Sequence, residues 1–186
     1  MVKLILIYVL SLSSISYASI LKPDSPCDES LLHTYYEICY SQNHRQALWT
    51  FHKLTKDSIS GDSKRKNNYR RDPKVADPVS KNDYKGSGFD RGHLVPAGDM
   101  KLNKIAMTET FFMTNMSPQR PDLNRKIWNS LEGGIRKMVK KLGDAWIVTA
   151  PILSNDLPQL PSHISIPKYY YKIAYFPLKK VMRAYL

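Results

Sequence analysis

The sequence predicts a mixed α+β fold arranged as one domain. With 186 residues, the chain is long enough for one sizeable core and short for two domains. From Asn124 onward, apolar residues recur at spacings of three and four, which is typical of an amphipathic helix. Residues 46–54 are dense in large apolar side chains and indicate a strand or short buried segment, while residues 145–150 and 169–176 favour strands by their β-branched and aromatic content. Strands on both sides of a helix indicate an α+β domain with a mixed or antiparallel sheet core.

The first half of the chain predicts few other regular elements. Residues 19–46 are polar and contain two prolines that oppose an early helix, so we expect an irregular segment. Residues 60–82 are rich in Lys, Arg, Asp, Asn and Pro and predict a long surface loop. The sequence Gly86-Ser87-Gly88 marks a turn, and residues 89–96 predict a short strand that ends at a proline.

The second half predicts two helices separated by a loop. Residues 104–112 favour a helix, and residues 115–123 favour a loop because two prolines block regular structure. The helix that begins near Asn124 is expected to end at Gly143, a residue typical of helix C-termini. Its predicted buried stripe consists of Ile127, Leu131, Ile135, Met138 and Leu142.

The charge balance favours a polyanionic partner. Lysine and arginine number 28 against 16 acidic residues, which gives a formal net charge of +12. Such a surplus suits nucleic acid, an anionic membrane surface or an acidic glycan, and charge alone does not choose among them or exclude a basic protein without a special partner. The loop at 60–82 is the first place to look for phosphate contacts, since it carries Lys64, Arg65, Lys66, Arg70, Arg71, Lys74 and Lys81.

The N-terminal residues are expected to form a signal peptide. Lys3 supplies a short positive region, and residues 4–12 form an apolar run that is short for a membrane span. The sequence Ser16-Tyr17-Ala18 offers small residues where a signal peptidase reads, so we expect cleavage after Ala18, with an uncleaved membrane anchor as the alternative. These features predict a periplasmic or secreted protein without stable membrane association after cleavage.

The two cysteines favour a disulfide. Cys27 and Cys39 are the only cysteines of the chain, and in an exported protein a lone pair is expected to form one bond. A redox or metal role is the alternative, although one pair supplies neither four zinc ligands nor a Cys-x-x-Cys motif.

Polar residues between positions 86 and 132 form the most informative pattern. His93 follows a turn, Asn124 opens the predicted helix, and Glu132 lies eight residues further along it. Each is weak evidence alone, because a lone histidine is more often structural and an asparagine at a helix start is usually a cap. In an α-helix, however, Asn124 and Glu132 are separated by roughly 80° around the axis and about 12 Å along it, so both can approach one site. An amide oxygen suits magnesium, and a nearby carboxylate can orient the waters that magnesium keeps.

Several motifs in this region resemble the DNA/RNA non-specific endonucleases with the ββα-metal finger, the family of Serratia nuclease and mitochondrial endonuclease G. The resemblance runs through Asp83-Tyr84-x-Gly86-Ser87-Gly88-Phe89-Asp90-Arg91-Gly92-His93-Leu94 and Thr110-Phe111-x-x-Thr114-Asn115-x-x-Pro118-Gln119. It extends to Asn124, Trp128, Leu131 and Glu132, and more loosely to Val148-Thr149-Ala150-Pro151. It covers at least residues 83–151 and implies a ββα-metal finger that carries the active site.

The resemblance implies a magnesium-dependent endonuclease that cuts DNA and RNA with little regard to sequence or sugar. His93 is expected to be the general base, and Asn124 the single direct protein ligand of the ion. Glu132 is expected to hold water bound to the metal, and Asn115 to orient His93 or the phosphate. Mg²⁺ is the expected cofactor, with Mn²⁺ as a substitute.

Basic and acidic residues beside these four also receive roles from the resemblance. Asp90 is expected to brace the metal finger, and Arg91 to contact phosphate or stabilise developing charge. A further phosphate-binding arginine of the family corresponds best to Arg65, with Arg70 and Arg71 close enough to remain alternatives.

The sequence departs from the family in two places. Ala150 replaces a glycine expected before the proline, which is a packing position. Family members also continue well beyond the position of Leu186. The endonuclease domain is expected over residues 19–186, with truncation at its C-terminus as an alternative. The rival from a different class is a catalytically inactive nucleic-acid-binding protein, and a zinc hydrolase built on the five histidines lacks a His-Glu-x-x-His motif.

Overall fold

The computed structural model describes residues 22–186 and shows an antiparallel sheet core, which confirms the predicted α+β class. Six strands follow the order β1-β2-β3-β6-β7-β8, and β4 and β5 form a separate antiparallel pair. The strands are β1 (Glu29–Leu32), β2 (Tyr36–Ser41), β3 (Gln46–Leu54), β4 (Asp90–His93), β5 (Met116–Gln119), β6 (Ala145–Pro151), β7 (Tyr170–Phe176) and β8 (Val181–Tyr185). The predicted signal peptide, residues 1–18, lies outside the described residues.

The helices are short apart from one. They are α2 (Lys56–Ser60), α3 (Lys104–Glu109), the π-helical turn η4 (Leu123–Trp128) and α4 (Asn129–Leu142). Short 3₁₀ turns are η1 (Lys81–Tyr84), η2 (Ala97–Asp99), η3 (Met113–Asn115) and η5 (Pro177–Lys179). Within residues 22–186, none of these helices is long and apolar enough to cross a membrane.

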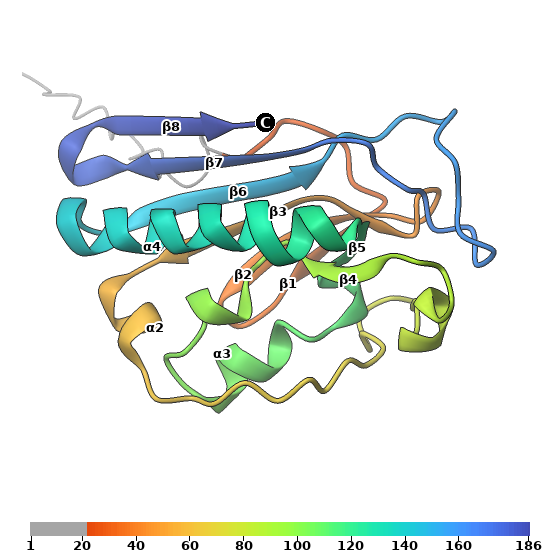
Figure 1. Cartoon of the computed structure of the whole chain (residues 1–186), viewed down its shortest axis with the longest axis horizontal. Helices are drawn as coiled ribbons and strands as arrows, with labels where there is room; N and C mark the ends of the chain where they lie inside the picture. Colours follow the sequence, from red (N-terminus) through yellow and green to blue (C-terminus); the bar gives the residue numbers. More distant parts are fainter. Residues whose placement is uncertain (1–21) are drawn as a thin grey trace, which may run out of the picture.

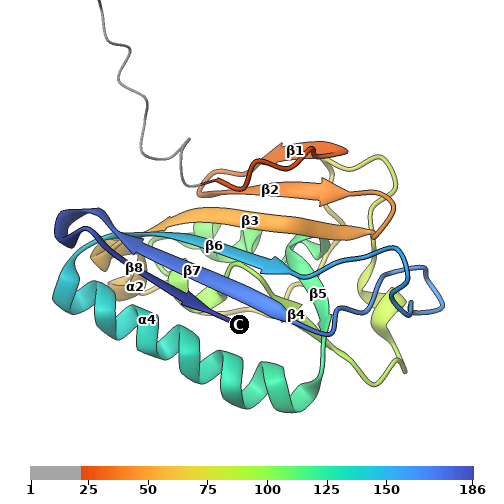
Figure 2. The same ribbon diagram turned by 90° about the horizontal axis from the view of Figure 1, so that it is seen from above.

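The helices and the β4–β5 pair all lie on one face of the large sheet (Figures 1 and 2). Helix α4 packs Ile135 and Val139 against Ile147 of β6 and Phe176 of β7. Burying each such apolar side chain contributes about 1.5–3 kcal/mol, so this seam fixes the position of α4 on the sheet. A second cluster joins β2 to the end of β4 and to Trp128 at the start of α4.

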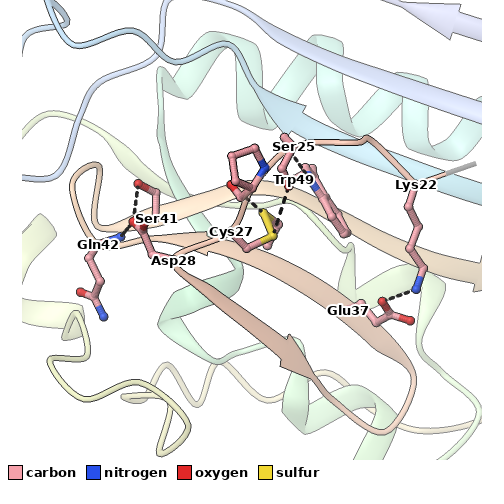
Figure 3. Close-up of a disulfide and its surroundings, with 10 residues drawn as sticks. Lys22, Ser25, Cys27, Asp28, Glu37, Ser41, Gln42 and Trp49 are labelled. Carbon is pink, nitrogen blue, oxygen red and sulfur yellow. Dashed lines mark hydrogen bonds and ion pairs between the residues drawn. A yellow bond between two sulfur atoms is a disulfide. The ribbon is translucent and has the colours of Figure 1, made fainter. Parts of the chain in front are cut away.

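The opposite face of the sheet is partly covered by the N-terminal segment, which a disulfide holds in place (Figure 3). Cys27 and Cys39 are bonded with an S–S distance of 2.02 Å, which confirms the predicted pairing. Trp49 of β3 donates to Ser25 Oγ at 2.9 Å, and Lys22 pairs with Glu37 at 2.5 Å. By loop closure alone, a short cross-link of this kind contributes about 2–3 kcal/mol to stability.

Two expected irregular segments are strands, and both predictions were wrong. Residues 19–46 contain β1 and β2, where Tyr36, Ile38 and Tyr40 alternate toward the core and β2 pairs with β3. Residues 115–123 contain β5, in which Pro118 lies opposite Arg91. Proline is tolerated there because β5 pairs only with β4 and is therefore an edge strand.

The predicted buried stripe of the long helix was wrong at its first position. Ile127 is 65% exposed, whereas its neighbour Trp128 is 4% exposed and packs in the core. The cause is the π-helical turn η4, which bonds i to i+5 and so shifts the phase of the residues before α4. The predicted end of the helix is confirmed at Gly143, whose φ of 97° favours glycine.

Candidate functional site

The candidate site is built on the β4–β5 pair and the helix that follows it. In β4, His93 lies opposite Met116, and Gly92 lies opposite Ser117. A Cβ at Gly92 would meet the Gln119 side-chain oxygen at 2.2 Å, so any larger residue at that position would have to displace the Gln119 side chain. Because α4 starts beside this pair, the three elements form a ββα unit on the sheet (Figure 1).

Asp90 ties β4 to the start of the helix. Its carboxylate accepts hydrogen bonds from Asn124 Nδ2 at 2.9 Å and from Arg125 at 2.7 and 2.8 Å. The hydrogen bonds from Arg125 hold the pKa of Asp90 below its usual value, so the carboxylate stays charged. Since the amide nitrogen of Asn124 is engaged by Asp90, its Oδ1 is left as the atom available to a ligand. Asp90 therefore joins β4 to the start of the helix.

His93 lies in an aromatic setting at the end of β4. Its ring meets Phe111 edge-on at a centroid distance of 5.0 Å and Tyr69 at 5.9 Å. Its Nε2 is buried and has no hydrogen-bond partner among the described residues, which leaves Nδ1 as the nitrogen available for proton transfer. Burial, and to a lesser degree the charge of Arg65, lowers the pKa of His93 to about 3. The imidazole is therefore neutral at physiological pH.

We expect His93 to remain neutral well below the pH at which an ordinary histidine titrates, about 6.5. NMR of the ring should show neutral-form shifts from about pH 7 down to about pH 4.5. Because the pKa is lowered in the folded state, its contribution to stability is complete above about pH 6.5 and is lost as pH falls toward 3. The urea midpoint of the wild type should therefore fall more than that of His93→Asn between these limits, and a ring that titrates near 6.5 contradicts the expectation.

A cleft of about 420 Å³ brings the expected site residues together. His93, Asn124 and Glu132 all line it, and for these three the expected proximity is therefore observed. Among the described residues that line this cleft, which we call the His93 cleft, Glu132 is the one acid. The lining cations are Arg65, Arg91, Lys101, Arg125 and Arg136.

The position of Glu132 is supported by a buried ionic network. Burial raises the pKa of Glu132 to about 7, while the positive charges of Lys172 and Arg136 act in the opposite direction. Arg136 lies 4.0 Å from Glu132 and donates to Asp99 at 2.7 Å. Asp99 also contacts His52 at 3.3 Å. The network fixes one wall of the His93 cleft.

Two side chains clamp the backbone that follows His93. Lys172 of β7 is buried and donates to the Leu94 carbonyl at 3.3 Å. The Asn115 amide accepts from Val95 N at 2.9 Å and donates to Val95 O and Thr110 O, both at 2.9 Å. Asn115 is fully buried and is not among the residues that line the His93 cleft, so its side chain holds the backbone just beyond His93.

The three candidate arginines differ in their position relative to the His93 cleft. Arg65 lines the His93 cleft and lies over the Phe111 ring at 5.3 Å. Arg70 instead donates to the Thr108 carbonyl at 2.6 Å and stacks on Phe112, away from the cleft lining. Arg71 is exposed and is also absent from that lining. Arg91 lines the cleft, lies 4.7 Å from the Tyr69 ring and donates to the Lys81 carbonyl.

Sequence reasoning missed Asp99, Arg136 and Lys172. Lys172 carried a usable signal, because it occupies an inward position in the alternating pattern of β7 and such a lysine needs polar partners. Arg136 lies one helical turn beyond Glu132, which is the spacing of a side-chain pair. Asp99 lies in a short turn without a periodic pattern and had no such signal.

The residues present fit a hard divalent cation held mainly by water. The free amide oxygen of Asn124 and the carboxylate of Glu132 line the same cleft, and both are oxygen donors of the kind that magnesium prefers. Across residues 22–186, no group of three or more His, Cys, Asp or Glu side chains is placed to hold an ion.

A family model for DNA/RNA non-specific endonucleases matches residues 18–185. The chain belongs to this family. The match spans both the ββα unit and the large sheet, so the family resemblance expected from residues 83–151 is confirmed over most of the chain.

Named relatives of this chain support the assignment to the family. The chain is 34% identical to the mitochondrial nuclease EXOG of Mus musculus over 159 residues, covering 78% of this chain and 43% of that protein. It is 35% identical to nuclease C1 of Cunninghamella echinulata, covering 76% and 63% respectively, and 31% identical to human mitochondrial endonuclease G, covering 74% and 51%. The chain thus spans about half the length of the curated relatives it matches.

The fold of the family is also found in a solved structure. A chain in the crystal structure of the EndoG/EndoGI complex superposes with a TM-score of 0.75 at 24% identity, covering 83% of this chain and 71% of that chain. This likeness confirms the expected fold, with its ββα unit on an antiparallel sheet.

The comparisons correct the expected location of this chain. The EXOG and endonuclease G relatives are named mitochondrial, which contradicts the prediction of a periplasmic or secreted protein. That prediction rested on a basic residue and an apolar run at the N-terminus, a pattern that does not by itself fix the compartment.

Proposed function

We propose that this chain is a divalent-metal-dependent endonuclease that hydrolyses phosphodiester bonds in DNA and RNA. The observation that carries the proposal is that a neutral histidine, an amide oxygen and a carboxylate line one cationic cleft. Cations around the cleft favour a phosphate, and His93 supplies a base beside it.

His93 is proposed as the general base that accepts a proton from the attacking water at Nδ1. Because its pKa is low, the ring is unprotonated and can accept a proton at all pH values near neutrality. The same low pKa makes it a weaker base than an ordinary histidine. Leu94 and Val95 are held by Lys172 and Asn115, so the ring is presented from a fixed backbone.

Asn124 and Glu132 are proposed to hold Mg²⁺, with Mn²⁺ as the substitute. Asn124 would bind through Oδ1, and Glu132 would orient the surrounding water. A bound ion supplies positive charge that stabilises the leaving oxygen and the phosphate in the transition state. Asp90 keeps Asn124 in place by its hydrogen bond to Nδ2.

Arg65 and Arg91 are proposed to bind the phosphates that flank the scissile bond. Both line the His93 cleft, and both are braced on aromatic rings, which limits the freedom that each loses on binding. Phosphate contacts carry no sequence information, and a water nucleophile makes the 2′-hydroxyl unnecessary. These features support cleavage with little regard to sequence or sugar.

A nicking assay on supercoiled plasmid, with Mg²⁺ and with a chelator, tests the proposal against an inactive nucleic-acid-binding protein. We expect metal-dependent nicking, and rates on duplex DNA, single-stranded DNA and RNA that lie within about two orders of magnitude. At subsaturating substrate, rates should fall steeply between about 50 and 200 mM salt. The slope of log affinity against log salt concentration is about −0.9 for each phosphate neutralised on duplex DNA. Binding without nicking at any metal concentration would support the inactive protein.

A further inference from the structure

A second cleft of about 500 Å³ lies beside the His93 cleft. The two share Tyr69, Arg91, Asn124 and Arg125 in their linings. We call the second the Phe89 cleft, after an aromatic residue found only in its lining. Because these four residues border both clefts, a nucleotide next to a phosphate bound beside His93 would lie close to the Phe89 cleft.

The Phe89 cleft combines an aromatic lining with a cationic one. Tyr84 is buried and Phe89 is half-buried beneath the turn, while Lys81 and Lys85 are exposed beside them. Gly86 and Gly88 make this turn with φ values of 73° and 79°, a conformation that favours glycine. Gly86 adds no side chain to this lining, and Phe89 is the ring of the turn that keeps part of its surface exposed.

The wall between the two clefts is already ordered. The Arg91 guanidinium lies 4.7 Å from the Tyr69 ring and donates to the Lys81 carbonyl at 3.1 Å. On the other side, Arg125 is held by two hydrogen bonds to Asp90. A ligand therefore meets planar aromatic and guanidinium surfaces that need little reorganisation, which favours binding.

We propose that the Phe89 cleft binds the unpaired base of the nucleotide next to the scissile phosphate. This inference rests on the proposed nuclease function. A phosphate alone would need only the cations, whereas a base stacks on aromatic rings without regard to its identity while its phosphate meets the lysines. The cleft thus adds a contact to substrate without adding sequence specificity. A base in a duplex must leave its stack to enter, so single strands are favoured over duplexes.

End-labelled single-stranded DNA with one abasic nucleotide at a known position tests the proposal. We expect cleavage at one neighbouring phosphodiester, the one that would place the missing base in the Phe89 cleft, to fall about tenfold relative to intact DNA. Phe89→Leu keeps apolar packing without an aromatic ring. In this variant, cleavage of intact DNA should fall, and the local loss of cleavage next to the abasic nucleotide, which we call the dip, should become smaller. Tyr169→Leu is the matched control, since Tyr169 is an exposed aromatic outside both linings and should leave the dip unchanged.

A binding measurement separates this proposal from the nuclease function. In the presence of chelator, fluorescence anisotropy with a short single strand should show about fivefold weaker binding by Phe89→Leu and unchanged binding by Tyr169→Leu. Weaker binding by Phe89→Leu in a chain that cleaves nothing would support the base site while the nuclease function fails. Uniform cleavage on both sides of the abasic position, or equal affinities for wild type and Phe89→Leu, would overturn the base site even in an active nuclease.

Discussion

Replacing His93 by alanine should reduce the rate of phosphodiester cleavage by about 10²–10⁴-fold, the usual contribution of a positioned general base. The Phe111 and Tyr69 rings flank His93, and neither carries an imidazole or a carboxylate that could take its place. Initial rates on plasmid and on single-stranded DNA at saturating Mg²⁺ measure the loss. Affinity for DNA in chelator should change little, since His93 is neutral and buried.

Folding has to be separated from catalysis in this experiment. His93→Asn keeps a polar group at the end of β4 and should lose activity to a similar extent while unfolding at nearly the wild-type urea concentration. His163→Asn is the matched control, because His163 is exposed with a φ of 61° that asparagine tolerates, and it should keep full activity. A His93→Ala protein that is folded and retains more than about a tenth of the rate would remove His93 from the role of base.

The parts of the fold that could be predicted from sequence are those whose hydrophobic pattern is long and local. The strands predicted at 145–150 and 169–176 correspond to β6 (Ala145–Pro151) and β7 (Tyr170–Phe176), and the helix that precedes them ends at Gly143 as expected. The π-helical turn could not be predicted, because one extra residue in a turn changes which side chain faces the core without changing composition. Trp128 therefore replaces Ile127 in the buried position.

The missed strands have a different cause. Residues 36–41 alternate toward the core, but their polar neighbours and the two prolines before them outweighed this short pattern. Pro118 indicated a loop and not a strand. Proline is nevertheless tolerated in β5, because β5 is an edge strand with a partner on one side only. Both β2 and β5 form because they pair with strands outside their own segments, and the local sequence carries no information about this pairing.

For the candidate site, the sequence motifs located His93, Asn124 and Glu132, and the structure places them around one cleft. The motifs could not locate the supporting network, since Lys172 reaches the Leu94 carbonyl from a strand 78 residues further along the chain. For Asn115, the motif suggested that it orients His93 or the phosphate, but it did not indicate through which atoms. In the structure its side-chain amide forms hydrogen bonds to the backbone of Val95 and Thr110.

Asn124→Ala should lose metal-dependent cleavage by about 10³-fold, because charge stabilisation by a bound ion supplies several kcal/mol in the transition state. The substitution removes the amide oxygen that lines the His93 cleft, and it leaves the Asp90–Arg125 ion pair to hold the start of the helix. The fold is therefore expected to persist. Calorimetric titration with Mg²⁺ and with Mn²⁺ should show the loss of binding directly, without reference to activity.

Two further variants make the result specific to Asn124. Asn129→Ala removes another amide from the lining of the same cleft and should bind the ion normally, so it is the matched control. Glu132→Gln should weaken binding less than Asn124→Ala, because a glutamine still accepts hydrogen bonds from water around the ion. If Asn124→Ala binds Mg²⁺ as the wild type does, or if Asn129→Ala loses the ion instead, the metal is held elsewhere and Asn124 has no part in holding it.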